Sequence, residues 1–274
     1  MEWELNVPKI LHVYWGGKKL SYLRYLTVLT FIKLNPDWDV RFYYPTIPTT
    51  HIPWRTGEQN LPEPQTDFTS ELMNLPITKT AINFRDYGFK NELSEVHKSD
   101  VIRLHLLSTV GGLWSDMDIF YFKPISLFHL NSEKYKNIET FYCNHDYGHS
   151  IGFLMSTPGN KFFESLLNIS KSLPPLKEYQ TFGATMYNTH FRAEGTIQQI
   201  TPAMNMSMEV VYSHRAGDTN ELLSTNPPKF KKESIGIHWY AGDQQWKDFL
   251  IKTDGGLKNV PDCVIGDLIK GFNT

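Results

Sequence analysis

Cysteine is scarce in this sequence, which carries only Cys143 and Cys263 among its 274 residues. The two lie far apart and form neither a CxxC pair nor a Cys/His metal pattern, which excludes a disulfide-stapled secreted domain. A chain of this length buries enough apolar surface to fold without disulfides. We therefore expect a reducing, cytoplasmic environment.

Long apolar runs and an excess of basic charge are also missing. No stretch approaches the roughly 18 apolar residues that a membrane span requires. Residues 1–9 are polar, with Glu2, Glu4 and Lys9, and predict neither a signal peptide nor a transmembrane anchor. The net charge is −2 without a long basic run, so nucleic acid is not an expected partner. Any membrane association is expected to be peripheral.

Aromatic residues, by contrast, make up 14% of the chain, and hydrophobic periodicity predicts alternating strands and helices. The predicted elements of the first half are a strand over 10–15, a helix over 20–34, a strand over 38–44, a helix over 95–110 and a strand from 113 through Asp118 to 122. Those of the second half are strands over 141–144, 151–156 and 235–240 and helices over 160–172 and 182–191. The strand–helix–strand order predicts parallel pairing. The proline-rich stretch 45–64 is expected to be an irregular surface excursion.

Two carboxylates, Asp116 and Asp118, follow the predicted strand at 113. Alternate residues of a strand face the same side, so we expect both to point into the ligand crevice of an open α/β sheet. Hard oxygen ligands suit Mg²⁺ or Mn²⁺ bound to phosphates, and a cation offsets the repulsion of two like charges. For an isolated Asp-x-Asp, a solvated turn is the alternative.

The helix before this pair carries Asp100 and Arg103, which share a helix face because they are three residues apart. A surface ion pair of little energetic consequence is one interpretation. The functional one gives Asp100 to sugar or ribose hydroxyls and Arg103 to phosphate or sugar oxygens.

Residues 98–118, KSDVIRLHLLSTVGGLWSDMD, closely resemble the sugar-binding region of DXD-containing glycosyltransferases. That group includes Och1-like mannosyltransferases, capsular polysaccharide transferases and the catalytic domains of large clostridial glucosylating toxins. The resemblance implies a GT-A fold, an α/β Rossmann-like mixed sheet flanked by helices, with an irregular C-terminal acceptor-side part. We expect one domain over 1–274, with a nucleotide-sugar-binding half (1–125) and an acceptor-side half (126–274).

Two further segments resemble the same enzymes. Residues 8–17, PKILHVYWGG, look like their first strand, which implies that Trp15 stacks on the nucleotide base and that His12 and Gly16 lie in the nucleotide site. Residues 235–246, IGIHWYAGDQQW, are similar to their late His-x-x-x-x-Ser-Trp element, which implies that His238 completes the metal shell. Gln245 replaces the usual Ser, so the role of that side chain stays open. Trp114 and Trp246 complete the predicted nucleotide-binding set.

The resemblance implies a metal-dependent retaining hexosyl- or pentosyltransferase. Its donor would be a nucleotide diphosphate sugar, with UDP favoured over GDP, and its acceptor a hydroxyl of a glycan or glycolipid. Mn²⁺ or Mg²⁺ would be held mainly by Asp118, helped by Asp116 directly or through water and by His238. A metal-dependent nucleotide-sugar phosphohydrolase and a non-catalytic carbohydrate-binding module are the alternatives.

Overall fold

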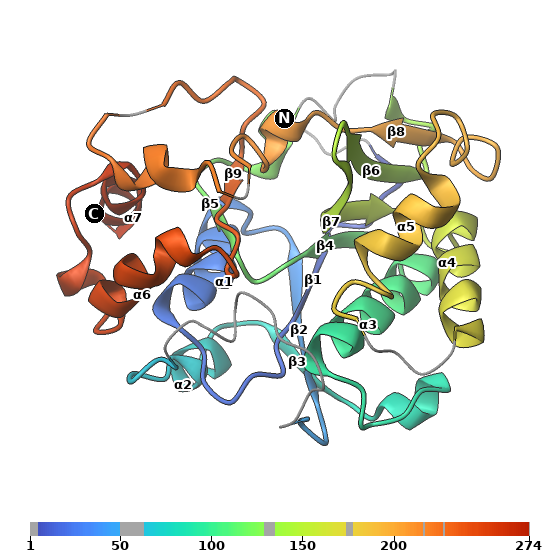
Figure 1. Cartoon of the computed structure of the whole chain (residues 1–274), viewed down its shortest axis with the longest axis horizontal. Coiled ribbons are helices and arrows are strands. Elements are labelled where there is room, and N and C mark those ends of the chain that lie inside the picture. The colour runs from blue at the N-terminus through green and yellow to red at the C-terminus, as the bar shows by residue number, and fades with distance from the viewer. Residues whose placement is uncertain are drawn as a thin grey trace.

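The computed structural model describes residues 5–49, 63–128, 135–173, 178–215, 217–226 and 228–273. Its centre is a seven-stranded sheet in the order β3-β2-β1-β4-β7-β6-β8, and β5 pairs with β9 in a second, two-stranded sheet (Figure 1). The strands are β1 (Ile10–Tyr14), β2 (Asp39–Pro45), β3 (Thr78–Ile82), β4 (Gly112–Ser115), β5 (Ile119–Tyr121), β6 (Thr140–His145), β7 (Gly148–Ser156), β8 (Ala203–Asn205) and β9 (Gly236–His238). The α-helices are α1 (Tyr22–Leu34), α2 (Thr69–Met73), α3 (Glu95–Thr109), α4 (Lys161–Ser172), α5 (Ala184–Phe191), α6 (Lys247–Thr253) and α7 (Val264–Asn273).

The sheet is mixed. β1 runs parallel to β2 and β4, and β2 runs parallel to β3, whereas β7 is antiparallel to both β4 and β6. The carboxyl ends of β1 and β4 therefore meet at one edge of the sheet, in a register that pairs His12 with Trp114. This places the Trp15-Gly16-Gly17 turn beside Asp116. The predicted α/β class and the parallel pairing of the first two strands are confirmed.

Helices cover both faces of the sheet because alternate residues of its strands point to opposite sides. Leu11 and Val13 pack with Phe31 of α1, whereas Tyr14 belongs to the cluster that contains Leu104 of α3. Figure 1 shows α3, α4 and α5 together on one side of the molecule and α1, α6 and α7 on the other. A third cluster joins α1 to α6, α7 and the small sheet.

Local sequence explains where α3 begins and ends. The Ser94 hydroxyl caps its first turn by accepting from the His97 N–H. At its other end, the Gly111 N–H donates to the Leu106 carbonyl while Gly111 adopts a φ of +69°. Glycine adopts this left-handed conformation without a steric penalty, as the Gly-Gly termination predicted.

The structure differs from the sequence prediction at one turn and at several elements, since β8, α2, α6 and α7 were not predicted. Asp116, Met117 and Asp118 do not continue a strand but form a turn that separates β4 from β5. β3 was not predicted at all. Of the predicted irregular excursion over 45–64, the greater part lies outside the described residues. Cys143 and Cys263 are both buried and free. Within the described ranges, no helix combines the length and apolar character needed to cross a membrane.

Replacing Gly111 with alanine is expected to destabilise the fold. A Cβ at this position would lie 2.6 Å from the backbone nitrogen of Pro158, whereas Gly195, also at positive φ, has nothing within 4 Å of its Cβ position. Both Gly111→Ala and Gly195→Ala incur the left-handed penalty, but only the first must displace backbone. We expect Gly111→Ala to lose about 1–3 kcal/mol more unfolding free energy in urea titrations than Gly195→Ala. Equal losses would show that β4 and the segment after β7 are not packed as described.

Candidate functional site

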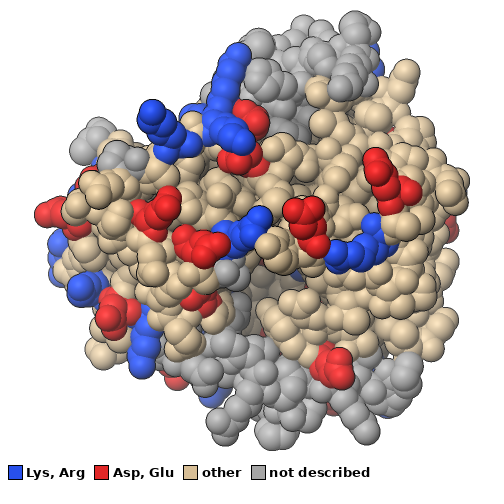
Figure 2. Space-filling model, turned by 45° about the horizontal axis from the view of Figure 1, so that its top comes forward, with Lys and Arg blue, Asp and Glu red and all other residues tan. Residues whose placement is uncertain are grey.

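A cleft with a volume of about 1200 Å³ opens at the edge where β1 and β4 end. Its walls also include the β6–β7 hairpin and the segments around 208–218 and 238–244. Seven of the predicted site residues line it: Trp15, Gly16, Asp100, Arg103, Asp116, Asp118 and His238. On the face drawn in Figure 2, acidic and basic side chains are interspersed, and no broad patch of one sign covers the described part of that face.

Asp118 and His238 form the centre of the cleft. β5 pairs with β9 so that Ile119 lies opposite His238, which brings the Asp118 Oδ1 atom to 3.1 Å from His238 Nε2. The Ala241 N–H donates to Asp118 Oδ2 at 2.9 Å. Burial alone would raise the pKa of Asp118, but the His238 imidazole, the Arg24 guanidinium and the Ala241 N–H together hold that pKa below its usual range.

Asp116 completes a group of three possible metal ligands. One ligand atom each from Asp116, Asp118 and His238 lies within 4.8 Å of the others. Asp116 Oδ1 accepts hydrogen bonds from Trp114 Nε1 at 2.8 Å and from Arg103 Nη2 at 3.0 Å. A Cβ on Gly152 would lie 2.8 Å from Asp116 Oδ2, so glycine is what makes room for this carboxylate.

Arg103 is a buried cation between two carboxylates. Its Nη2 lies 3.3 Å from Asp100 Oδ1, and the guanidinium lies 5.0 Å from the centre of the Trp114 ring. Burial raises the pKa of Asp100 to about 7, with Arg103 opposing the shift and Asp116 adding to it. Among the described residues, Arg103 Nε and Nη1 have no hydrogen-bond partner, and both atoms are buried.

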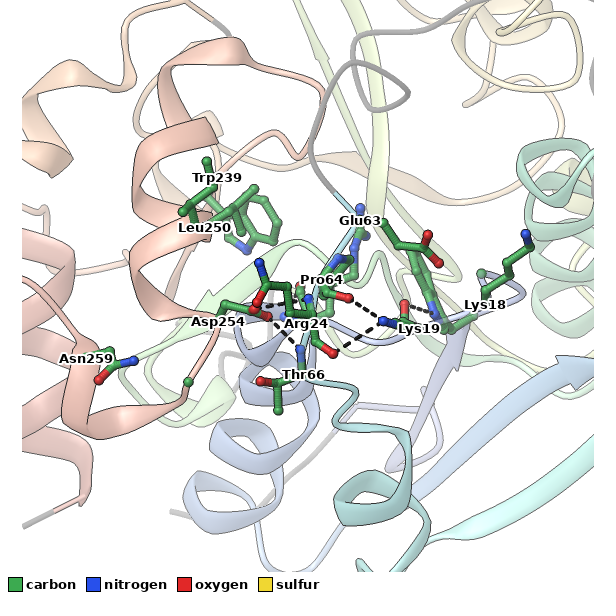
Figure 3. Close-up of a pocket in the computed structure, with 16 residues that line it drawn as sticks. Lys18, Lys19, Arg24, Glu63, Pro64, Thr66, Trp239, Leu250, Asp254 and Asn259 are labelled. Carbon is green, nitrogen blue, oxygen red and sulfur yellow. Dashed lines mark hydrogen bonds between the residues drawn. The ribbon is translucent and has the colours of Figure 1, made fainter.

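Trp15 stands half-buried where the cleft meets a second cavity of about 620 Å³, shown in Figure 3. The Arg24 guanidinium of α1 lies 4.2 Å from the centre of the Trp15 ring and 5.6 Å from that of Trp239. The indole Nε1 donates to the Lys19 carbonyl at 3.3 Å. One face of the Trp15 indole therefore packs against Arg24, and the hydrogen bond at Nε1 fixes the orientation of the ring.

Three residues predicted to bind nucleotide are buried and do not line the cleft. The Trp114 side chain is buried and orients Asp116. Trp246 is buried against Trp239 and donates to the Thr219 hydroxyl. His12 is buried between the Gly111 carbonyl and the Tyr43 hydroxyl. These side chains support the site from behind and do not reach a ligand in the cleft.

The sequence patterns did not identify several of the residues that line the cleft. Arg24 lies on a helix whose apolar spacing gives no hint of a ligand, and Glu95 reads as an ordinary first-turn acid. Tyr147, at the tip of the β6–β7 hairpin, is 66% exposed at the cleft rim. Gln245, whose role was open, accepts from the Thr219 hydroxyl and donates to the Gly217 carbonyl, so it braces the loop.

Comparison with known protein families supports the resemblance to capsular polysaccharide transferases. Residues 82–172, about a third of the chain, match the family model described as capsular polysaccharide synthesis protein. This segment contains α3, the Asp116–Asp118 turn and α4. The predicted kinship with capsular polysaccharide transferases is thereby confirmed over this segment, and the mixed α/β sheet is the architecture predicted for GT-A glycosyltransferases. No curated protein matches the chain.

Solved glycosyltransferase structures show a distant likeness. The PaToxG glycosyltransferase is 17% identical, with 72% of this chain and 65% of that chain covered and a TM-score of 0.41. The galactosyltransferase LgtC, in complex with donor and acceptor sugar analogs, is 11% identical over 92% of this chain and 98% of its own, with a TM-score of 0.48. The UDP-bound glycosyltransferase domain of the YGT toxin is 12% identical over 92% and 78%, with a TM-score of 0.37. At these TM-scores the function has to be inferred from this chain's own site.

The buried His12 predicts a pH dependence of stability. Burial lowers its pKa from 6.5 to about 4, although the hydrogen bond that Nε2 donates to the Gly111 carbonyl opposes this shift, and the neutral ring can accept at Nδ1 from the Tyr43 hydroxyl. Between pH 6.5 and 4 the unfolded chain binds a proton that the native chain does not, so acid favours unfolding. His12 should account for a loss of about 2 kcal/mol between pH 7 and pH 5.

Urea titrations of His12→Gln at both pH values test this expectation. The variant is less stable at pH 7, but its loss on acidification should be smaller than that of the wild type by that amount. His190→Gln, at an exposed position of α5, is the control and should keep the wild-type slope. An unchanged slope in His12→Gln would contradict a neutral, buried His12.

Proposed function

We propose that this glycosyltransferase moves a sugar from a nucleotide diphosphate sugar to a hydroxyl of a glycan or glycolipid, with the help of a divalent metal. One observation carries the proposal. Asp116, Asp118 and His238 converge within 4.8 Å in a cleft that has the half-buried Trp15 on its rim. A metal end and an aromatic end in one cleft fit the two ends of a nucleotide diphosphate.

The three side chains suit Mn²⁺ or Mg²⁺. Two carboxylates are the oxygen ligands that both ions prefer, and the imidazole of His238 favours Mn²⁺ because Mg²⁺ selects oxygen. We take Asp118 as the principal ligand from the resemblance, because hydrogen bonds engage both Asp118 Oδ2 and Asp116 Oδ1 and do not decide between the two carboxylates. The bound ion would act as a Lewis acid on the diphosphate of the donor.

Arg103 and Asp100 support the reacting end of the donor. The guanidinium of Arg103, which lines the cleft, would stabilise the charge of the departing diphosphate or contact the sugar, in a buried setting where a fixed charge acts strongly. Asp100 would orient sugar hydroxyls. A retaining reaction, in which the acceptor attacks from the leaving-group side and its proton passes to the departing phosphate, needs no carboxylate base.

The Trp15 indole would stack on the base of the donor nucleotide. Arg24 covers one face of the indole, so the base would stack on the other. We favour UDP over GDP on the strength of the resemblance to the toxins. The donor half (1–125) would be completed by His238 from the acceptor-side half (126–274), whose β6–β7 hairpin and exposed Tyr147 would face the acceptor.

Metal-dependent nucleotide binding is the first test. By calorimetry, UDP or GDP should bind only with Mn²⁺ or Mg²⁺, and EDTA should abolish binding. Asp118→Asn should remove the metal-dependent signal because it deletes the principal anionic ligand. Asp262→Asn, at a carboxylate whose side chain is 93% exposed and outside the cleft, is the matched control and should bind as the wild type does.

The reaction products separate the alternatives. With Mn²⁺ and sugar nucleotides but no acceptor, we expect slow release of free sugar and nucleoside diphosphate. Nucleoside monophosphate or inorganic phosphate would identify a phosphohydrolase instead. Full-strength glycan binding without metal or nucleotide would identify a carbohydrate-binding module.

Trp15 should contribute through stacking. Trp15→Ala is expected to weaken nucleotide binding by about 1–3 kcal/mol, the range for loss of one base–aromatic contact. Trp15→Phe keeps a flat ring and should recover most of that loss. An affinity unchanged in Trp15→Ala would assign the indole to packing against Arg24 alone.

A further inference from the structure

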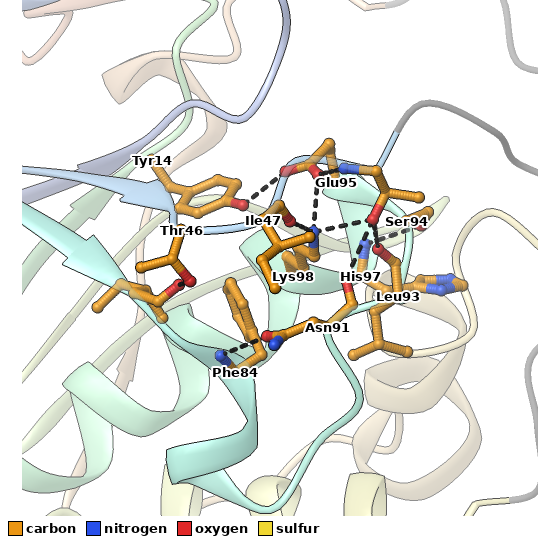
Figure 4. Close-up of polar contacts among 12 residues, drawn as sticks. Tyr14, Thr46, Ile47, Phe84, Asn91, Leu93, Ser94, Glu95, His97 and Lys98 are labelled. Carbon is orange, nitrogen blue, oxygen red and sulfur yellow. Dashed lines mark hydrogen bonds and ion pairs between the residues drawn. The ribbon is translucent and has the colours of Figure 1, made fainter.

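A fully buried lysine lies at the start of α3. Lys98 Nζ donates to the Ile47 carbonyl at 2.7 Å, to the Thr49 hydroxyl at 2.8 Å and to Glu95 Oε1 at 2.9 Å (Figure 4). An ammonium has three donors, and all three are used here. Burying this charge without an anion would be costly, so the ion pair holds the Glu95 carboxylate in place beside Lys98.

The Glu95 carboxylate is held by the protein at three of its acceptor positions. Besides Lys98, Oε1 accepts from the Thr49 N–H at 2.6 Å, and Oε2 accepts from the Tyr14 hydroxyl at 2.6 Å. A carboxylate offers about four such positions. Among the described residues, nothing donates to the remaining position, on Oε2, and the side chain keeps 20% exposure and lines the cleft.

Oε2 also lies directly beside the turn after β1. A Cβ on Gly16 would overlap this atom, so the glycine allows the backbone next to Trp15 to approach the carboxylate. The carboxylate therefore sits next to the aromatic end of the cleft and away from the metal end.

α3 runs from one end of the cleft to the other. Glu95, Ser99 and Arg103 follow at intervals of four residues on one helix face, and all three line the cleft. Glu95 contacts Tyr14 of β1, and Arg103 contacts Asp116. The eight residue steps from Glu95 to Arg103 span about 12 Å of helix. In a nucleotide diphosphate laid along this face, the ribose comes between the base at Trp15 and the diphosphate at Asp116, next to Glu95.

We propose that Glu95 accepts a hydrogen bond from a ribose hydroxyl of the donor nucleotide and thereby selects ribonucleotides over deoxyribonucleotides. The inference rests on the proposed function, because it requires a nucleotide in this cleft. A locked carboxylate is a strong acceptor, and a nucleotide without the hydroxyl leaves the charge without that bond.

Calorimetry with Mn²⁺ and three ligands, UDP, 2′-deoxy-UDP and 3′-deoxy-UDP, tests the inference. In the wild type, at least one deoxy form should bind on the order of 10-fold more weakly than UDP, as expected for the loss of a hydrogen bond to a charged group. In Glu95→Gln the charge is lost and this ratio should shrink several-fold. Glu92→Gln, the same change at an exposed side chain that lies outside the cleft, should keep the wild-type ratio.

The possible failures are distinguishable. Equal wild-type binding of UDP and both deoxy forms would overturn the role of Glu95 and leave the proposed function intact. A uniform loss for all three ligands in Glu95→Gln would show that the carboxylate only positions the loops, and would also overturn it. If the protein binds GDP in place of UDP, the same comparison with GDP and its deoxy forms decides. Absence of any nucleotide binding would refute the proposed function itself.

Discussion

Two short strands, β5 and β9, hold the centre of the candidate site together by antiparallel pairing. Their register sets Ile119 opposite His238, and the Trp239 N–H donates to the Asp118 carbonyl at 2.9 Å. Backbone hydrogen bonds thus fix two ligand side chains that lie far apart in the sequence. The pairing also carries the Ala241 N–H to Asp118 Oδ2. Any loss of this pairing would separate the two candidate metal ligands even if every side chain were retained.

The second constraint is the buried charge along α3. Arg103 needs Asp100 and Asp116 because an unpaired guanidinium in the interior is unstable, and Lys98 needs Glu95 for the same reason. Each buried cation therefore fixes at least one carboxylate that borders the cleft. Such pairs contribute little net stability, but they position anionic groups before a ligand arrives. The helix thereby pre-organises both ends of the cleft.

Sequence patterns predicted those parts of the molecule that depend on nearby residues. The spacing of Asp100, Arg103 and Asp116 is local, and so are the apolar periodicity of α3 and the glycines that end it. The parallel pairing of β1 with β2 followed from the single strand–helix–strand connection between them. The resemblance at 235–246 placed His238 at the metal end, and the structure brings it to Asp118. What nearby residues could not predict was the turn at Met117, since the apolar residues at 113–114 before it and at 119–120 after it are typical of one continuous strand.

The three tryptophans show why the rest of the site could not be predicted without the tertiary structure. Trp15, Trp114 and Trp246 are chemically identical, and each was expected to meet the nucleotide. Their surroundings depend on how the adjoining elements fold back against them: Arg24 of α1 contacts Trp15, Arg103 of α3 contacts Trp114, and Trp239 contacts Trp246. Only Trp15, at the exposed end of β1, keeps a surface for a ligand. An aromatic residue in a motif therefore indicates proximity to the site, and tertiary packing decides whether it binds the ligand or supports the residue that does.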